Sequence, residues 1–103
     1  MAHDALRVSV YVNEGDEWHN APLYVAVLRM LHERGIAGAT VLQAVAGFTG
    51  DGALQTPPIV DAGRKPPCVI EFVDTAAKVN GIMPQLKHMV SNRLIVTQPV
   101  EVV

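Results

Sequence analysis

Apolar and polar side chains alternate near the start of the chain. Leu6, Val8, Val10 and Val12 are separated by Arg7, Ser9 and Tyr11. A period of two is the pattern of a strand with one buried face. Residues 6–13 are therefore predicted to form the first strand, and the polar run 13–19 a loop.

The next periodic segment has the spacing of a helix. Asn20 can cap it, and Pro22 suits a first turn because the backbone N–H there needs no partner. Gly35 can adopt the left-handed conformation that closes a helix. These signals predict a helix over about residues 21–34. Its apolar stripe consists of Leu23, Val27, Met30 and Leu31.

Residues 39–48 favour a strand and carry small apolar side chains on both faces. This pattern predicts a strand buried on both sides, either central in the sheet or packed against another subunit. Residues 49–66 follow and are rich in glycine and proline. They are predicted to form a long connection, and connections of this length are usually functional or disordered.

Residues 67–73 are predicted to form the third strand, with Asp74 or Thr75 capping a second helix. Pro84 interrupts that helix, which predicts a kink or a late start near Gly81. The helical stripe comprises Val79, Ile82, Met83, Leu86, Met89 and Val90.

The last predicted strand is short, residues 94–96, and Pro99 confines the residues after it to a sheet edge or a short extra strand. The order βαββαβ predicts a single α+β domain over residues 1–103, with two helices on one face of a four-stranded antiparallel sheet. The other sheet face, which would carry Val45 and Val69, is then uncovered. Three such sheets around a common axis would bury it in a homotrimer.

Composition supports self-association and argues against nucleic-acid binding and membrane insertion. Half of the residues are hydrophobic and only 17% are charged, with a formal net charge of −2. The eight Lys and Arg residues are dispersed along the chain, so they form no basic patch of the kind that binds nucleic acid. The chain has no apolar run long enough for membrane insertion and no apolar core of a signal peptide, so we expect a cytoplasmic protein.

The glycine-rich turn leaving the second strand is the sharpest local candidate for ligand binding. Backbone N–H groups of Gly47, Phe48, Thr49 and Gly50 could approach an anion closely. The turn matches neither a Walker motif nor a dinucleotide fingerprint. A hinge for the long connection is the alternative interpretation.

Three cations are placed by topology to reach an anion near that turn. Arg64 and Lys65 end the long connection, and Arg93 lies in the turn before the last strand. Ordinary solvated charge is the alternative for each of them. The sequence predicts no catalytic residue and no metal ligand, because its four histidines share no ligand spacing and Cys68 lies within a strand.

Several segments together resemble a known family over nearly the whole chain. They are Leu6-Arg-Val-Ser-Val-Tyr-Val, Pro22-Leu-Tyr-Val-Ala-Val-Leu, Glu33-Arg-Gly-Ile-Ala-Gly-Ala-Thr-Val-Leu, Gly47-Phe and Pro67-Cys-Val-Ile-Glu-Phe-Val-Asp. The chain resembles the PII-like family of domain of unknown function 190. The resemblance implies a ferredoxin-like fold, a homotrimer and a flexible T-loop over residues 49–65. In PII proteins, adenine nucleotides occupy clefts between subunits, and the T-loop docks on a transporter or an enzyme.

The leading hypothesis is therefore a non-enzymatic sensor of a small ligand, possible ligands being an adenine nucleotide or another small anion. Two alternatives share the architecture. One is a small ferredoxin-like enzyme, of the isomerase or monooxygenase type, since fold does not fix function. The other is a metal-responsive trimer like the CutA proteins.

Overall fold

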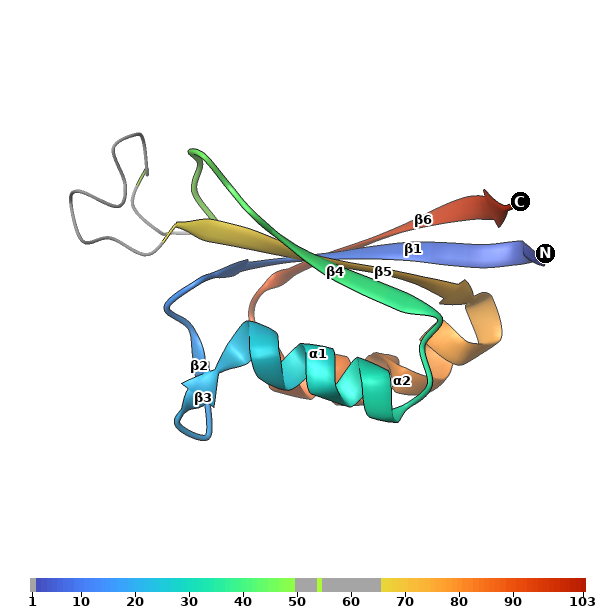
Figure 1. Ribbon diagram of the computed structural model, residues 1–103, viewed down its shortest axis with the longest axis horizontal. Helices are drawn as coiled ribbons and strands as arrows, with labels where there is room; N and C mark the ends of the chain where they lie inside the picture. Colours follow the sequence, from blue (N-terminus) through green and yellow to red (C-terminus); the bar gives the residue numbers. More distant parts are fainter. Residues whose placement is uncertain (1, 50–53, 55–65) are drawn as a thin grey trace.

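The computed structural model describes residues 2–49, 54 and 66–103. Both helices lie on one face of the sheet, and no described helix or strand covers the opposite face (Figure 1). No helix in the described part of the chain is long and apolar enough to cross a bilayer. In chain order the elements are β1 (Ala2–Asn13), β2 (Glu17–Trp18), β3 (Ala21–Pro22), α1 (Leu23–Glu33), β4 (Gly38–Gln43), β5 (Pro67–Thr75), α2 (Ala76–Met89) and β6 (Leu94–Val102).

The main sheet has the strand order β4-β5-β1-β6, and every neighbouring pair is antiparallel. With α1 after β1 and α2 after β5, this is the predicted ferredoxin-like βαββαβ arrangement, which is confirmed. The short β2–β3 hairpin is an addition to it. It forms where the sequence predicted only a loop.

The core lies between the sheet and the two helices. Val8, Val10 and Val12 of β1 have no exposed surface, and each faces a buried residue of β5 in the antiparallel register. Burying one such side chain stabilises the fold by about 1.5–3 kcal/mol. The predicted helical stripes close over this layer. Their buried members are Leu23, Val27, Met30 and Leu31 of α1, and Val79, Ile82 and Leu86 of α2.

The second predicted strand differs from the structure. β4 ends at Gln43, lies at the sheet edge, and most of its side chains are exposed. The prediction of a central position in the sheet is therefore wrong, and packing of this strand against another subunit stays a prediction. The sequence shows that side chains on both faces of the strand are apolar. It does not show which of the two faces another element covers. Leu42, on the uncovered face, is 54% exposed.

The first helix begins later than predicted. Ala21 and Pro22 pair with β2, and α1 starts at Leu23 with no side-chain cap. Asn20 is not the cap, because it occupies the hairpin turn with φ of 67° next to His19 at 49°. A two-residue hairpin of this kind requires positive φ at both turn positions. Gly35 does take the expected left-handed conformation, with φ of 75°.

The second helix begins at Ala76. The predicted late start near Gly81 is therefore wrong. Thr75 is the N-cap of this helix, and the hydroxyl of Thr75 accepts a hydrogen bond from the Lys78 N–H at 3.3 Å. α2 then continues through Pro84 to Met89. Burial of the stripe on both sides of Pro84 offsets the missing backbone hydrogen bond. After α2, β6 extends to Val102 with Pro99 inside it at the sheet edge, where an absent N–H is tolerated.

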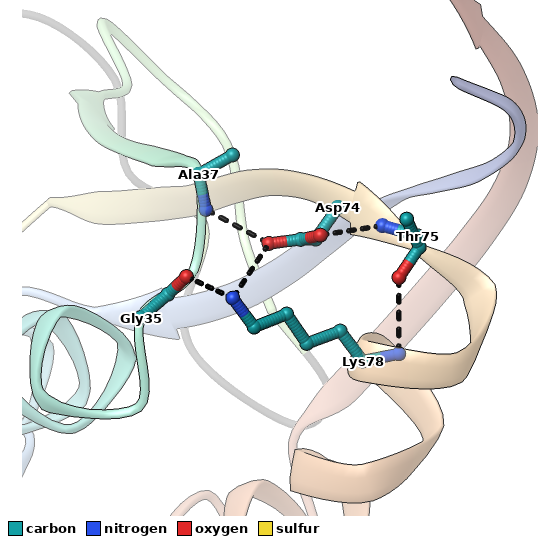
Figure 2. A network of polar contacts seen from close by, with 5 residues as sticks. All are labelled: Gly35, Ala37, Asp74, Thr75 and Lys78. Carbon is teal, nitrogen blue, oxygen red and sulfur yellow. Dashed lines mark hydrogen bonds and ion pairs between the residues drawn. The ribbon is translucent and has the colours of Figure 1, made fainter. Parts of the chain in front are cut away.

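Asp74 ties the junction between α1 and β4 to the junction between β5 and α2 (Figure 2). Its carboxylate accepts hydrogen bonds from the Ala37 N–H at 2.9 Å and the Thr75 N–H at 2.7 Å. Lys78 adds an ion pair to Asp74 at 3.8 Å and donates a hydrogen bond to the Gly35 carbonyl. The end of α1 and the start of α2 are thus held against each other.

Replacing Asp74 tests this junction. Asp74→Ala removes the charged acceptor of two backbone hydrogen bonds and one partner of the ion pair with Lys78, so we expect the free energy of unfolding to fall by about 2 kcal/mol. Urea denaturation measures it, with Asp4→Ala at an exposed position of β1 as the matched control. Equal stability of the two variants would contradict a structural role for Asp74.

Candidate functional site

The ends of the four main strands meet at one end of the sheet. β1 finishes at Asn13 opposite Pro67, where β5 begins, and Leu94 at the start of β6 pairs with Tyr11. β4 ends there as well, with Gln43 opposite Cys68. The predicted glycine-rich turn and Arg93 are therefore brought to the same end of the molecule, as their topology predicted.

Residues 13–16, called here the 13–16 turn, contact both ends of the long connection. The Asn13 side-chain oxygen accepts a hydrogen bond from the Thr49 hydroxyl at 3.1 Å. The Glu14 N–H donates to the carbonyl of Pro66 at 2.9 Å. Glu14 Oε2 also accepts from Gln43 Nε2 at 2.6 Å. One short turn thus touches the residues with which the connection starts and ends.

The local sequence explains the shape of this turn. Asp16 Oδ2 accepts from the Asn13 N–H at 2.9 Å, and the Asp16 N–H donates to the Asn13 carbonyl at 3.0 Å. Asp and Asn favour turns because their side chains bond nearby backbone groups. The Asp16 carbonyl accepts from the Leu23 N–H at 2.8 Å. The turn is thereby anchored to the first residue of α1.

Arg93 is bound to the same turn. Its Nε and Nη2 atoms each lie 2.9 Å from a different oxygen of Asp16, a bidentate pair. Burial opposes ionisation of Asp16, but the hydrogen bonds from Arg93 and from the Asn13 N–H outweigh it and hold the pKa of Asp16 below its usual value. The pair in turn raises the pKa of Arg93. Both groups are charged at neutral pH.

Arg93 also lines an open depression of about 470 Å³ beside the turn between α2 and β6. Lys87, Ser91 and Asn92 line it too. The lining supplies two cations, a hydroxyl and an amide, all of which can donate hydrogen bonds to an anion. Anion binding at Arg93 stays a prediction, and one donor fork of Arg93 is already occupied by Asp16.

The structure describes some of the remaining predicted site residues and not others. Gly47 has φ of 146°, a conformation that favours glycine, and Phe48 beside it is 65% exposed. Thr49 bonds Asn13 as described above. Gly50, Arg64 and Lys65 lie outside the described residues, as does most of the predicted T-loop. The anion cradle at residues 47–50 stays a prediction.

Sequence reasoning missed Asn13, Glu14 and Asp16, which were assigned only to a polar loop. The sequence contains a signal for this turn, since Asn-Glu-Gly-Asp directly follows the first predicted strand. In an antiparallel sheet the end of that strand lies beside the start of another strand.

Among the described residues, no three His, Cys, Asp or Glu side chains gather as a metal-ligand set. Burial, with Glu14 and Asp16 nearby, raises the pKa of the buried Cys68 thiol to about 11.

Trp18 fastens the hairpin to the helical layer. Its ring stacks on His19 with centroids 4.3 Å apart, meets His88 of α2 edge-on at 5.5 Å, and packs against the core. A groove of about 350 Å³ runs beside it between the helices. These contacts hold the β2–β3 hairpin against the helical layer.

Comparisons with known proteins agree with this architecture. The family model DUF190, described as "Uncharacterized ACR, COG1993", matches residues 5–102. A UPF0166 protein of Methanocaldococcus jannaschii is 28% identical over 85 residues, which cover 82% of this chain and 78% of that protein. A UPF0166 protein of Aquifex aeolicus is 28% identical over 94 residues, covering 91% and 89%.

Two solved structures share the fold. The divalent ion tolerance protein CutA1 from Ehrlichia chaffeensis superposes with a TM-score of 0.67 at 10% identity, covering all of this chain and 87% of that one. CPII bound to ADP and bicarbonate, from Thiomonas intermedia K12, has a TM-score of 0.58 at 13% identity and covers 98% and 93%. At such low identity the likeness establishes the ferredoxin-like fold.

The Asp16–Arg93 pair predicts an acid-sensitive component of stability. Because folding lowers the pKa of Asp16 from 3.8, the pair stabilises the fold above that pH, and this contribution is lost as pH falls through the folded-state pKa. We expect Asp16→Asn to reduce the free energy of unfolding by about 1 kcal/mol at pH 7 and by less at pH 3, which lies below the ordinary pKa of an aspartate.

Urea denaturation at the two pH values checks this, with Glu33→Gln, an exposed change on α1, as the control for net charge. If Asp16→Asn lowers the free energy of unfolding by the same amount at both pH values, the ion pair is not the source of that loss.

Proposed function

Because the chain belongs to the family of domain of unknown function 190, we propose that it is a PII-like regulatory protein that senses a small ligand. The ligand binds beside Arg93, and the long connection of residues 49–66 transmits the binding to a protein partner. No catalysis is assigned to the chain. The observation that carries the proposal is the 13–16 turn, which contacts Arg93 and both ends of that connection.

The proposed ligand is an anion that carries phosphate, with an adenine nucleotide as the first candidate. Arg93 and Lys87 supply positive charge at the depression, and Ser91 and Asn92 supply neutral donors. Arginine forks match phosphate oxygens in geometry as well as charge. ADP in the structurally similar CPII protein makes the same ligand class reasonable here.

The proposed assembly is a homotrimer that covers the open face of the sheet. The cross-strand register aligns Leu42, Val69, Tyr11 and Leu94 in one row across that face. Leu94 is 61% exposed and Val96, in the next row, is 42% exposed. Apolar rows of this kind are costly to leave in water. Neighbouring subunits would then supply the second wall of the depression, which is open in one subunit.

The partner proposed for residues 49–66 is a membrane transporter or an enzyme, and the proposed location is the cytoplasm. Both follow from the likeness to PII proteins. Phe48, directly before this segment, and Leu54, within it, are exposed apolar side chains, at 65% and 62%. Exposed aromatic and aliphatic residues are typical anchors of protein interfaces.

Ligand binding tests the proposed function. We expect ADP or ATP to raise the melting temperature of wild type and to titrate in calorimetry, because a ligand at 100 times its dissociation constant adds about 2.7 kcal/mol of stability. Arg93→Gln should weaken binding about tenfold or more, since it removes a charged contact to phosphate. Arg29→Gln on the exposed side of α1 is the matched control.

The same screen includes cyclic nucleotides, bicarbonate, divalent metals and small organic acids. Stabilisation by a divalent metal alone would replace the proposal with a metal-responsive protein of the CutA type. Stabilisation by an organic acid alone, followed by its turnover, would replace it with an enzyme.

Self-association is tested by charging the apolar row. Leu94→Asp places a carboxylate in the proposed interface, so we expect a trimeric wild type to dissociate to monomers at micromolar concentration. Sedimentation velocity measures the change. Val103→Asp, at a fully exposed position outside the row, should leave the assembly intact. A monomeric wild type would contradict the proposed assembly.

A further inference from the structure

We propose that the phosphate of the ligand replaces the Asp16 carboxylate on Arg93, and that this exchange is the signal passed to the long connection. The inference rests on the proposed function and adds the step that converts ligand binding into a signal. It starts from the occupied state of Arg93, whose Nε and Nη2 are both bonded to Asp16 at 2.9 Å.

Charge favours exchange over simple addition. Arg93 and Asp16 together carry no net charge, so the paired arginine offers little attraction to a second anion. Glu14 lies in the same turn and adds a further negative charge. A dianionic phosphate competes with a single carboxylate for the guanidinium because its charge is larger and its oxygens fit the same fork. A monoanionic carboxylate ligand has no such advantage over Asp16.

The geometry allows the exchange without unfolding the turn. The Asp16 carbonyl bonds the Leu23 N–H and the Asp16 N–H bonds the Asn13 carbonyl, so the backbone stays anchored when the side chain leaves. The side chain of Asp16 is 15% exposed and that of Arg93 is 35% exposed. The pair therefore lies at the surface, where an incoming ligand can reach it.

Departure of Asp16 reaches the long connection through Asn13. A single atom, Asp16 Oδ2, accepts hydrogen bonds from both Arg93 Nε and the Asn13 N–H, each at 2.9 Å. A carboxylate that rotates away from Arg93 moves this shared acceptor. Asn13 holds the Thr49 hydroxyl through its own side chain. Ligand binding at Arg93 thus changes a contact at the first residue of the connection.

Asp16→Asn in the full chain distinguishes exchange from its main alternative, in which Asp16 orients Arg93 for the ligand. Asparagine keeps an oxygen for the Asn13 N–H but no longer competes as an anion. We expect ADP and inorganic pyrophosphate to bind about fivefold more tightly, the factor that corresponds to about 1 kcal/mol. Glu14→Gln removes the same charge from the same turn without a contact to Arg93, and should tighten binding by less than twofold.

Isothermal calorimetry measures the affinities, and amide hydrogen exchange follows the coupling. In wild type, ADP should accelerate exchange at the Asn13 amide. Unchanged or weaker binding in Asp16→Asn, with wild type still binding ADP, overturns the exchange and leaves the proposed function in place. Equal tightening by Glu14→Gln also overturns it, because general electrostatics would then suffice. Failure of both wild type and Asp16→Asn to bind either probe overturns the proposed nucleotide function and the exchange with it.

Discussion

β1 lies between β5 and β6, and its antiparallel pairing with both strands is the constraint on which the rest of the structure depends. The register is strongly specified, because a slip of one residue would turn Val8, Val10 and Val12 from the core to the open face. Once it is set, Asn13 lies opposite Pro67, and Tyr11 lies opposite Leu94. The turn after β1 is then held between the start of β5 and the residue before β6. The candidate site is a consequence of this pairing.

The two ends of the sheet are held by different kinds of contact. At the Asp74 end, the carboxylate is bonded to the backbone N–H groups of Ala37 and Thr75, and these bonds join the segment after α1 to the start of α2. At the other end, Asp16 and Arg93 are joined through side chains near the surface. Such pairs contribute about 0–1 kcal/mol, so a ligand can replace one without unfolding the protein. The first end suits a fixed junction and the second a switch.

One of the segments that carry the family resemblance, which includes residues 34–40, lies at the fixed end. Gly35 is left-handed, and its carbonyl accepts from Lys78. Arg34 donates to Gln85 Oε1 at 2.5 Å and to the Gly81 carbonyl at 3.3 Å. These contacts join α1 to α2 and lie far from the 13–16 turn along the sheet. This part of the family signature therefore describes how the fold closes, and the site must be inferred from other residues.

The sequence by itself determined the βαββαβ order, the apolar stripes of both helices and the inward face of β1. These features depend on the spacing of apolar residues that are close together in the chain. The sequence also limited the cap of the second helix to Asp74 or Thr75, and the residues after Pro99 to a sheet edge or a short extra strand. Only the tertiary structure decided that β4 is an exposed edge strand, that residues 21–22 form a hairpin, and that Arg93 is paired. Asp16 and Arg93 are 77 residues apart. No local pattern records such a contact, since it exists only after the strands between them have taken their register.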